Sequence, residues 1–153
     1  MISILNQRIN NLILITVVII SDQLSKQVII NNSQMLINKS LKIIQLTYTE
    51  NYGAAFNIFE GNRIFLSLVS LLSSFILIFL IFVKRNLNFI DRIGLSLILG
   101  GTLGNGIDRI YKGYVVDFIQ LKFINFPIFN IADLAINIGF LLLLISMFKY
   151  KKI

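Results

Sequence analysis

The feature that most constrains this chain is the segment Ile64–Val83, an uninterrupted apolar run without a charged side chain. The hydrocarbon core of a bilayer is about 30 Å thick, and a helix of about 20 apolar residues crosses it. The run has this length and is flanked by Arg63 and Lys84. It therefore predicts a transmembrane helix.

The composition agrees with a membrane protein and narrows the possible chemistry. Hydrophobic residues make up 56% of the chain and charged residues 14%, whereas soluble domains carry about 25% charged residues. The chain contains no cysteine and no histidine, which excludes disulfides, Cys- or His-ligated metals, and Ser-His-Asp or Cys-His catalysis. Any catalysis must use Asp, Glu, Lys, Ser or Tyr.

The basic surplus has two possible meanings. A net charge of +7 is compatible with nucleic-acid binding, but the lysines and arginines form no dense run and are separated by apolar stretches. In a membrane protein such a surplus more often sets orientation. We therefore expect no nucleic-acid partner.

Three further apolar stretches lie beside aspartates, and each is short unless its aspartate is inside the helix near one end. The first resembles a secretory signal peptide, but its basic region is weak and no cleavage site follows it, so we expect a retained helix. We predict an all-α integral membrane protein, a single domain over residues 1–153. Its four transmembrane helices are expected at about 9–30, 64–83, 91–109 and 129–148.

Orientation follows from the bias of lysine and arginine toward cytoplasmic loops, which is moderate here. It predicts that both termini are cytoplasmic. The basic residues of the predicted cytoplasmic segments are Arg8, Lys84, Arg85, Arg92, Lys149, Lys151 and Lys152. Those of the predicted outer loops are Lys39, Lys42, Arg63, Lys112 and Lys122. Four aspartates then gather at the outer leaflet: Asp22, Asp108, Asp117 and Asp133. Ionisable groups at membrane depth indicate function by default.

The two predicted outer loops, 31–63 and 110–128, contain segments typical of strands. Residues 41–49 (LKIIQLTYT) and 114–123 (YVVDFIQLKF) are rich in β-branched and aromatic residues. They predict a small extracytoplasmic β-structure.

The first polar motif, SDQLSK, places Asp22 and Lys26 four residues apart, on one helix face. We interpret this pair as structural, near the interface, with the Lys26 side chain snorkelling toward water.

The second motif, NYGAAF, offers the amide of Asn51 beside Gly53, where a backbone can approach closely. A tight turn would explain it equally well.

The third motif, GGTLGNGIDR, has a G-x-x-x-G spacing at Gly100 and Gly104, which favours close helix packing. Packing does not explain Asn105, Asp108 and Arg109 at the end of the same helix. Arg109 could hold a carboxylate or anchor at lipid headgroups.

The last two motifs supply the carboxylates most suited to chemistry. Asp117 is the only charge in the strand-like run GYVVDFI. In FNIAD, Asn130 is a good N-cap and Asp133 falls at the third helical position. Two converging aspartates can share one proton and act as acid and base. The helix dipole favours Asp133 as the initial base, although such a pair titrates as a unit.

Two other functions fit the same carboxylates. A small transporter could use them as a proton relay, although relays often place carboxylates at several depths. A non-enzymatic adaptor could use them to hold helices together.

In this order, the five motifs resemble those of the bacterial lipoprotein signal peptidase family (signal peptidase II). The resemblance implies an aspartic endopeptidase of the bacterial cytoplasmic membrane, with its active site near the outer leaflet and without a metal or other cofactor. We expect a monomer. It implies cleavage of lipid-modified prolipoproteins before the diacylglyceryl-cysteine, with membrane lipids as further partners. It assigns catalysis to Asp117 and Asp133, and substrate binding or support to Asp22, Lys26, Asn51, Gly53, Asn105, Asp108, Arg109, Asn130 and Ala132.

Overall fold

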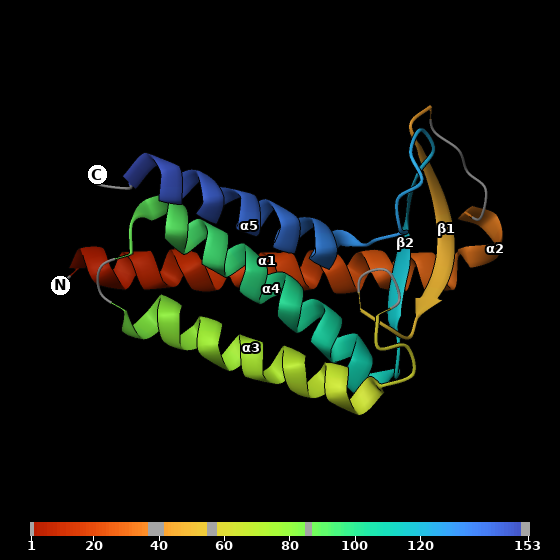
Figure 1. Cartoon of the computed structure of the whole chain (residues 1–153), viewed down its shortest axis with the longest axis horizontal. Coiled ribbons are helices and arrows are strands. Elements are labelled where there is room, and N and C mark those ends of the chain that lie inside the picture. Colours follow the sequence, from red (N-terminus) through yellow and green to blue (C-terminus); the bar gives the residue numbers. More distant parts are fainter. Residues whose placement is uncertain (1, 37–41, 55–57, 85–86, 151–153) are drawn as a thin grey trace.

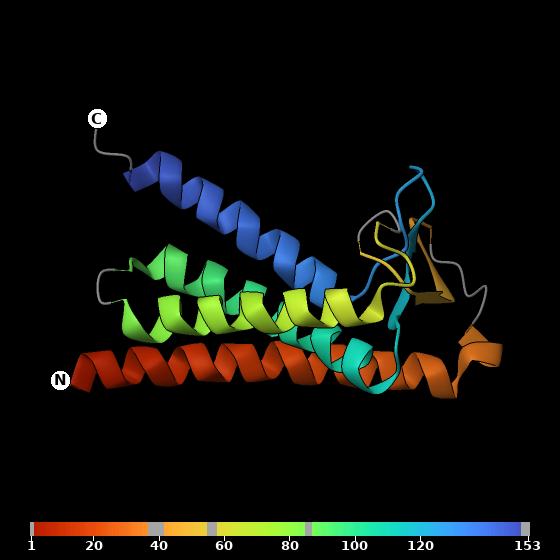
Figure 2. The ribbon, with the colours of Figure 1, turned by 60° about the horizontal axis from the view of Figure 1, so that its bottom comes forward.

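The computed structural model describes residues 2–36, 42–54, 58–84 and 87–150. Long helices form a bundle, and a small sheet lies at the end of the bundle opposite both termini (Figures 1 and 2). The elements are α1 (Ile2–Asn31), α2 (Ser33–Leu36), β1 (Ile44–Asn51), α3 (Arg63–Val83), α4 (Phe89–Tyr111), β2 (Val115–Leu121) and α5 (Ile131–Tyr150).

Among the described residues, three helices are long and apolar enough to cross a membrane: Leu5–Asn31, Arg63–Val83 and Ile131–Lys149. Their outward faces are apolar, as at Leu71 and Phe75, whose side chains are 63% and 70% exposed. Such surfaces suit lipid rather than water. These three predicted spans are therefore confirmed as candidate spans, with ends that differ from the predicted ones by a few residues, and by several at the start of α1.

Helix α4 coincides with the fourth predicted span but is not among the three helices that are long and apolar enough to cross a membrane. It contains charged residues at both ends and several glycines, and it packs against α1, α3 and α5. The fourth span stays a prediction. The glycines allow the close packing: a Cβ on Gly100 would lie 2.8 Å from Val18 Cβ, and one on Gly104 would lie 2.7 Å from Asp22 Oδ2. The predicted G-x-x-x-G packing face is confirmed.

The two predicted strand segments pair as an antiparallel two-stranded sheet, at Ile44–Asn51 and Val115–Leu121. Thr49 lies opposite Asp117, and Asn51 lies opposite Val115. An isolated bridge between Ile119 and Phe129 brings the segment that leads into α5 beside β2. Asp117 therefore lies close to the beginning of α5.

Helix α2, within the first predicted outer loop, was not anticipated from the sequence. Several predicted features lie outside the described residues: Lys39 and Leu41 of the first loop, Ala55 and Phe56 of NYGAAF, and the basic residues Arg85, Lys151 and Lys152.

Candidate active site

Asp117 and Asp133 are joined through one residue, Asn130. The side-chain amide of Asn130 donates to Asp117 Oδ1 at 2.7 Å, and the backbone N–H of Asn130 donates to Asp133 Oδ2 at 3.2 Å. Asn130 is fully buried and Asp117 is 2% exposed, while Asp133 is half-buried. The structure thus brings together the two carboxylates that the sequence singled out.

The contacts between Asn130 and Asp133 form a reciprocal cap at the beginning of α5. The side-chain oxygen of Asn130 accepts from the backbone N–H of Asp133 at 2.9 Å, while the Asp133 carboxylate accepts from the Asn130 backbone. This is the geometry of a capping box. The predicted N-cap at Asn130 is confirmed, and the cap fixes the orientation of the Asp133 side chain.

The electrostatic state of Asp117 follows from its surroundings. The pKa of Asp117 is raised to about 7, mainly by burial and secondly by the negative charge of Asp133. Hydrogen bonds from Asn51 and Asn130 lower this pKa and offset part of the increase. A buried carboxyl beside a second carboxyl is costly to ionise. Asp117 can therefore hold or release a proton near neutral pH.

A second polar cluster, centred on Lys26, supports the pair from α1 and α4. The ammonium Nζ lies 2.8 Å from Asp22 Oδ2 and 2.9 Å from Asp108 Oδ2, and it donates to Asn105 Oδ1 at 2.9 Å. Lys26, Asp22 and Asp108 are all fully buried. The predicted ion pair is confirmed, but the predicted snorkelling is wrong, because three buried oxygen acceptors hold the ammonium inside the protein.

Asn105 connects this cluster to the carboxylate pair. Its oxygen accepts from Lys26, and its side-chain N–H donates to Asp133 Oδ1 at 2.8 Å. The same oxygen accepts from Asn130 at 3.1 Å. The Lys26 charge therefore polarises the amide that binds Asp133.

Asp22 also reaches α5, since its Oδ1 accepts from the backbone N–H of Ala132 at 3.0 Å. Ala132 is fully buried, and a Cβ added at Gly101 of α4 would collide with its carbonyl oxygen. The small residues at these two positions let α4 and the first turn of α5 approach each other.

The other side of Asp117 is held by the last residue of β1 and the residues that follow it. Asn51 donates to Asp117 Oδ2 at 2.9 Å, and its own oxygen accepts from the backbone N–H of Gly53 at 2.9 Å. Arg109 then donates to the carbonyl of Gly53 at 2.9 Å. Arg109 thus anchors a backbone carbonyl instead of a carboxylate, although its charge lies within electrostatic range of Asp133 and Asp117.

Two contributors were not predicted. Gln23 donates to Asp22, to the carbonyl of Gly104 and to Asp108 at 3.1, 3.1 and 3.4 Å. The position of Gln23 inside the SDQLSK motif could have indicated its part in the cluster. Glu50 accepts from Tyr48 and Tyr52 at 2.8 and 2.6 Å, and these hydrogen bonds lower the pKa of Glu50. They brace the end of β1 next to Asn51.

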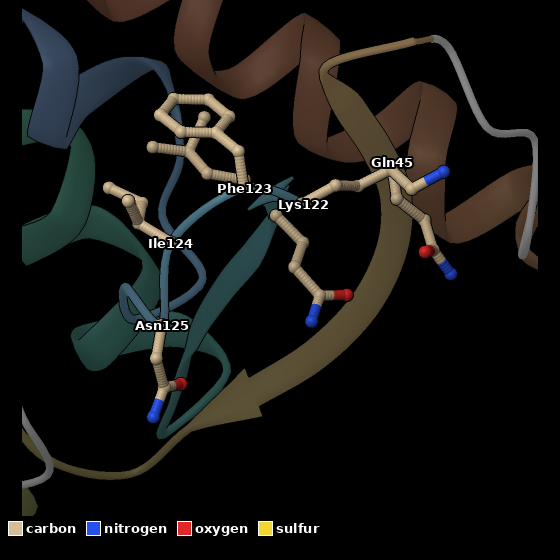
Figure 3. A pocket seen from close by; sticks show the side chains of 7 residues that line it. Gln45, Lys122, Phe123, Ile124 and Asn125 are labelled. Carbon is tan, nitrogen blue, oxygen red and sulfur yellow. The ribbon is translucent and has the colours of Figure 1, made fainter.

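The part of the chain that the structure describes contains no group of three or more carboxylates placed to hold a metal ion. A separate hollow of about 440 Å³ lies at the far end of the sheet, between Gln45 and the segment Gln120–Asn125 (Figure 3). No carboxylate lines this hollow, so it has no counterpart of Asp117 and Asp133.

Together, the fold and the site define a helical membrane protein with two carboxylates held by the same asparagine at one end of its bundle. Residues 14–149 match the family model described as Signal peptidase (SPase) II. The chain belongs to the signal peptidase II family.

Similar proteins agree in sequence and in fold. The chain is 43% identical to a lipoprotein signal peptidase of Lactobacillus johnsonii, over 89% of this chain and 90% of the relative. It is 38% identical to one of Lactococcus lactis subsp. lactis, over 95% and 98% of the two chains. A solved bacterial membrane enzyme superposes with a TM-score of 0.82 at 31% identity, over 94% of each chain.

Proposed function

We propose that this protein is an aspartic endopeptidase that removes signal peptides from prolipoproteins by cutting before the diacylglyceryl-modified cysteine. The observation that carries the proposal is the convergence of Asp117 and Asp133 on Asn130, in a chain similar to proteins named lipoprotein signal peptidases. No histidine or cysteine is available as an alternative catalytic group.

The reaction needs one protonated and one ionised carboxyl. The surroundings of the two aspartates favour the ionised form of Asp133 and the protonated form of Asp117. Each carboxylate accepts from two N–H donors, but only Asp133 lies in the first turn of a helix, where the positive end of the α5 dipole stabilises the ionised form. Burial and the Asp133 charge raise the pKa of Asp117 to about 7. We assign Asp133 as the initial base and Asp117 as the initial acid.

In the first step, Asp133 takes a proton from water, and the water oxygen attacks the carbonyl carbon of the scissile peptide bond. Asp117 gives its proton to the carbonyl oxygen, which yields a neutral gem-diol. In the second step, Asp133 gives its proton to the amide nitrogen and Asp117 takes a proton from a diol hydroxyl. The C–N bond then breaks, leaving a carboxylic acid and an amine.

We propose that the remaining polar residues position this pair or the substrate. Lys26, Asp22 and Asp108 would fix Asn105 and the first turn of α5. Asn51, Gly53 and Arg109 would fix the other side of Asp117.

We further propose that α4 is a fourth transmembrane helix and that 1–153 is one membrane domain. Helix α4 runs from the end of the bundle where α3 ends to the end where the sheet lies (Figure 1). A helix that connects the two ends of a spanning bundle must cross the same thickness. Its polar residues then face α1 and α5 instead of lipid.

The proposed location is the bacterial cytoplasmic membrane, with cytoplasmic termini and the site near the outer leaflet. The absence of native cysteine permits a direct test with single-cysteine variants. Lys122→Cys should react with an impermeant maleimide in intact cells, and Lys84→Cys only after lysis. The reverse pattern would contradict the orientation.

This placement suits a prolipoprotein, whose signal helix lies in the bilayer with its cleavage site at the outer interface. We also propose that the enzyme acts as a monomer. Specific activity that stays constant on dilution would support this.

The decisive experiment measures cleavage of a lipidated precursor peptide and its unlipidated counterpart by purified variants. Asp117→Asn and Asp133→Asn should insert and fold but lose activity by about 10²–10⁴-fold, the usual contribution of a general acid or base. Asp91→Asn is the matched control, because the backbone N–H of Asp91 also donates to a capping asparagine, Asn88, and its carboxylate accepts from the Asn88 side chain, at the other end of the bundle. An Asp117→Asn protein that still cleaves would refute the assignment.

A further inference from the structure

A groove of about 380 Å³ lies on the outer surface of the bundle, between the beginning of α3 and the end of α4. Its lining consists of Arg63, Ile64, Ser67, Leu68, Leu71 and Ile110. Leu68, Leu71 and Ile110 are more than half exposed. The groove is thus an apolar surface channel with a single charged residue in its lining.

Arg63 is held in a fixed position at this groove. Its Nε donates to the carbonyl of Arg109 at 2.8 Å, and its Nη2 donates to the carbonyl of Ile110. Both carbonyls belong to the last turn of α4. Nη1 takes part in neither bond, and the guanidinium has five N–H donors in total. The side chain is therefore anchored and still has donors to offer.

The charge of Arg63 has no counterion within the described part of the chain. The ion pairs found there join Lys26 to Asp22 and Asp108, and Lys112 to Asp108. Arg63 also immediately precedes the apolar run of α3. In a bilayer this position is the depth of the lipid headgroups.

We propose that this groove binds one anionic phospholipid of the surrounding bilayer. The phosphate accepts hydrogen bonds from the Arg63 guanidinium, which suits phosphate geometry. One acyl chain begins beside Ile110 and lies along Leu68 and Leu71, toward the middle of the membrane. An anionic lipid is preferred to a zwitterionic one because the isolated positive charge is neutralised only by a net negative headgroup. The inference does not depend on peptidase activity.

The test measures lipid retention by native mass spectrometry of the purified full chain in detergent. Phosphatidylglycerol and phosphatidylcholine are supplied in equal amounts. Wild type should retain one phosphatidylglycerol in preference to phosphatidylcholine. Arg63→Gln should reduce this retention about tenfold, since it removes a charge-assisted hydrogen bond to the phosphate, and Arg63→Lys should reduce it less.

Arg8→Gln is the matched control, because Arg8 is also exposed and also donates to a helix-end carbonyl, that of Phe82 at 3.0 Å. It removes the same charge at the opposite end of the bundle and should leave retention unchanged. Ser67→Phe fills the groove while keeping Arg63, so it should also release the lipid. Equal retention of both lipids by wild type, equal losses in the Arg63 and Arg8 variants, or full retention by Ser67→Phe would each overturn the proposal.

Discussion

The side-chain amide of Asn130 donates to Asp117 Oδ1 at 2.7 Å, so the residue that caps α5 also binds the carboxylate of the neighbouring strand. One buried side chain therefore fixes the distance between a strand and a helix. Because Asn130 contacts Asp133 as well, any movement of the α5 cap also moves both carboxylates of the candidate site.

Replacing this residue should affect activity far more than stability. Asn130→Ala should cost about 0.5–2 kcal/mol of stability, the usual value of an N-cap, and should lower the rate of precursor cleavage about 100-fold through misplacement of both carboxylates. Asn88→Ala removes the equivalent cap of α4, which bonds Asp91. It should cost similar stability in thermal unfolding while leaving the cleavage rate nearly unchanged. Equal rate losses would contradict a special role for Asn130.

Activity should fall as the pH rises through the pKa of Asp117, which is raised to about 7, because the acid form is present below that pKa and lost above it. The hydrogen bond from Asn51 lowers this pKa. Asn51→Ala should therefore raise the pKa and shift the alkaline limb of kcat/KM upward by about one pH unit. Asn125→Ala, an exposed change, should not shift it. A downward shift in Asn51→Ala would contradict the assignment.

The buried ammonium should be essential for stability. Lys26→Met leaves the carboxylates of Asp22 and Asp108 without their shared partner and should cost about 3–5 kcal/mol, as expected for breaking a buried ion pair. Asp22→Asn combined with Lys26→Met should cost less than the sum of the single changes, because it also removes one of the unpaired charges. Denaturant unfolding in detergent measures both. Additive losses would show that the two residues are not coupled.

Small residues at the α4–α5 contact should matter for catalysis. A methyl group at Gly101 would collide with the backbone carbonyl of Ala132 and should push the first turn of α5, with Asp133, away from α4. Gly101→Ala should lower the cleavage rate by about 10- to 100-fold. Gly106→Ala is the control, because its nearest neighbour would be the Ser70 Cβ, at 3.2 Å, away from α5. Its rate should stay close to that of wild type.

Features that depend on local sequence were predicted with little error. The apolar run before Lys84 predicted α3, and the β-branched and aromatic residues around Asp117 predicted β2. The cap at Asn130 and the packing face at Gly100 and Gly104 were also predicted. Each is a property of neighbouring residues, or of residues three to four apart on one helix.

The contacts between distant residues could not be predicted in this way. Lys26 was expected to reach water, and only the crossing of α1 with α4 places Asp108 and Asn105 around its ammonium. Arg109 binds the Gly53 carbonyl because the β1 segment folds back over the end of α4. The sequence alone determined which segments are apolar, which are strands and which carboxylates lie near their ends. The tertiary structure decided which polar groups pair with each other, because a buried charge takes the partners that helix packing brings within hydrogen-bond distance.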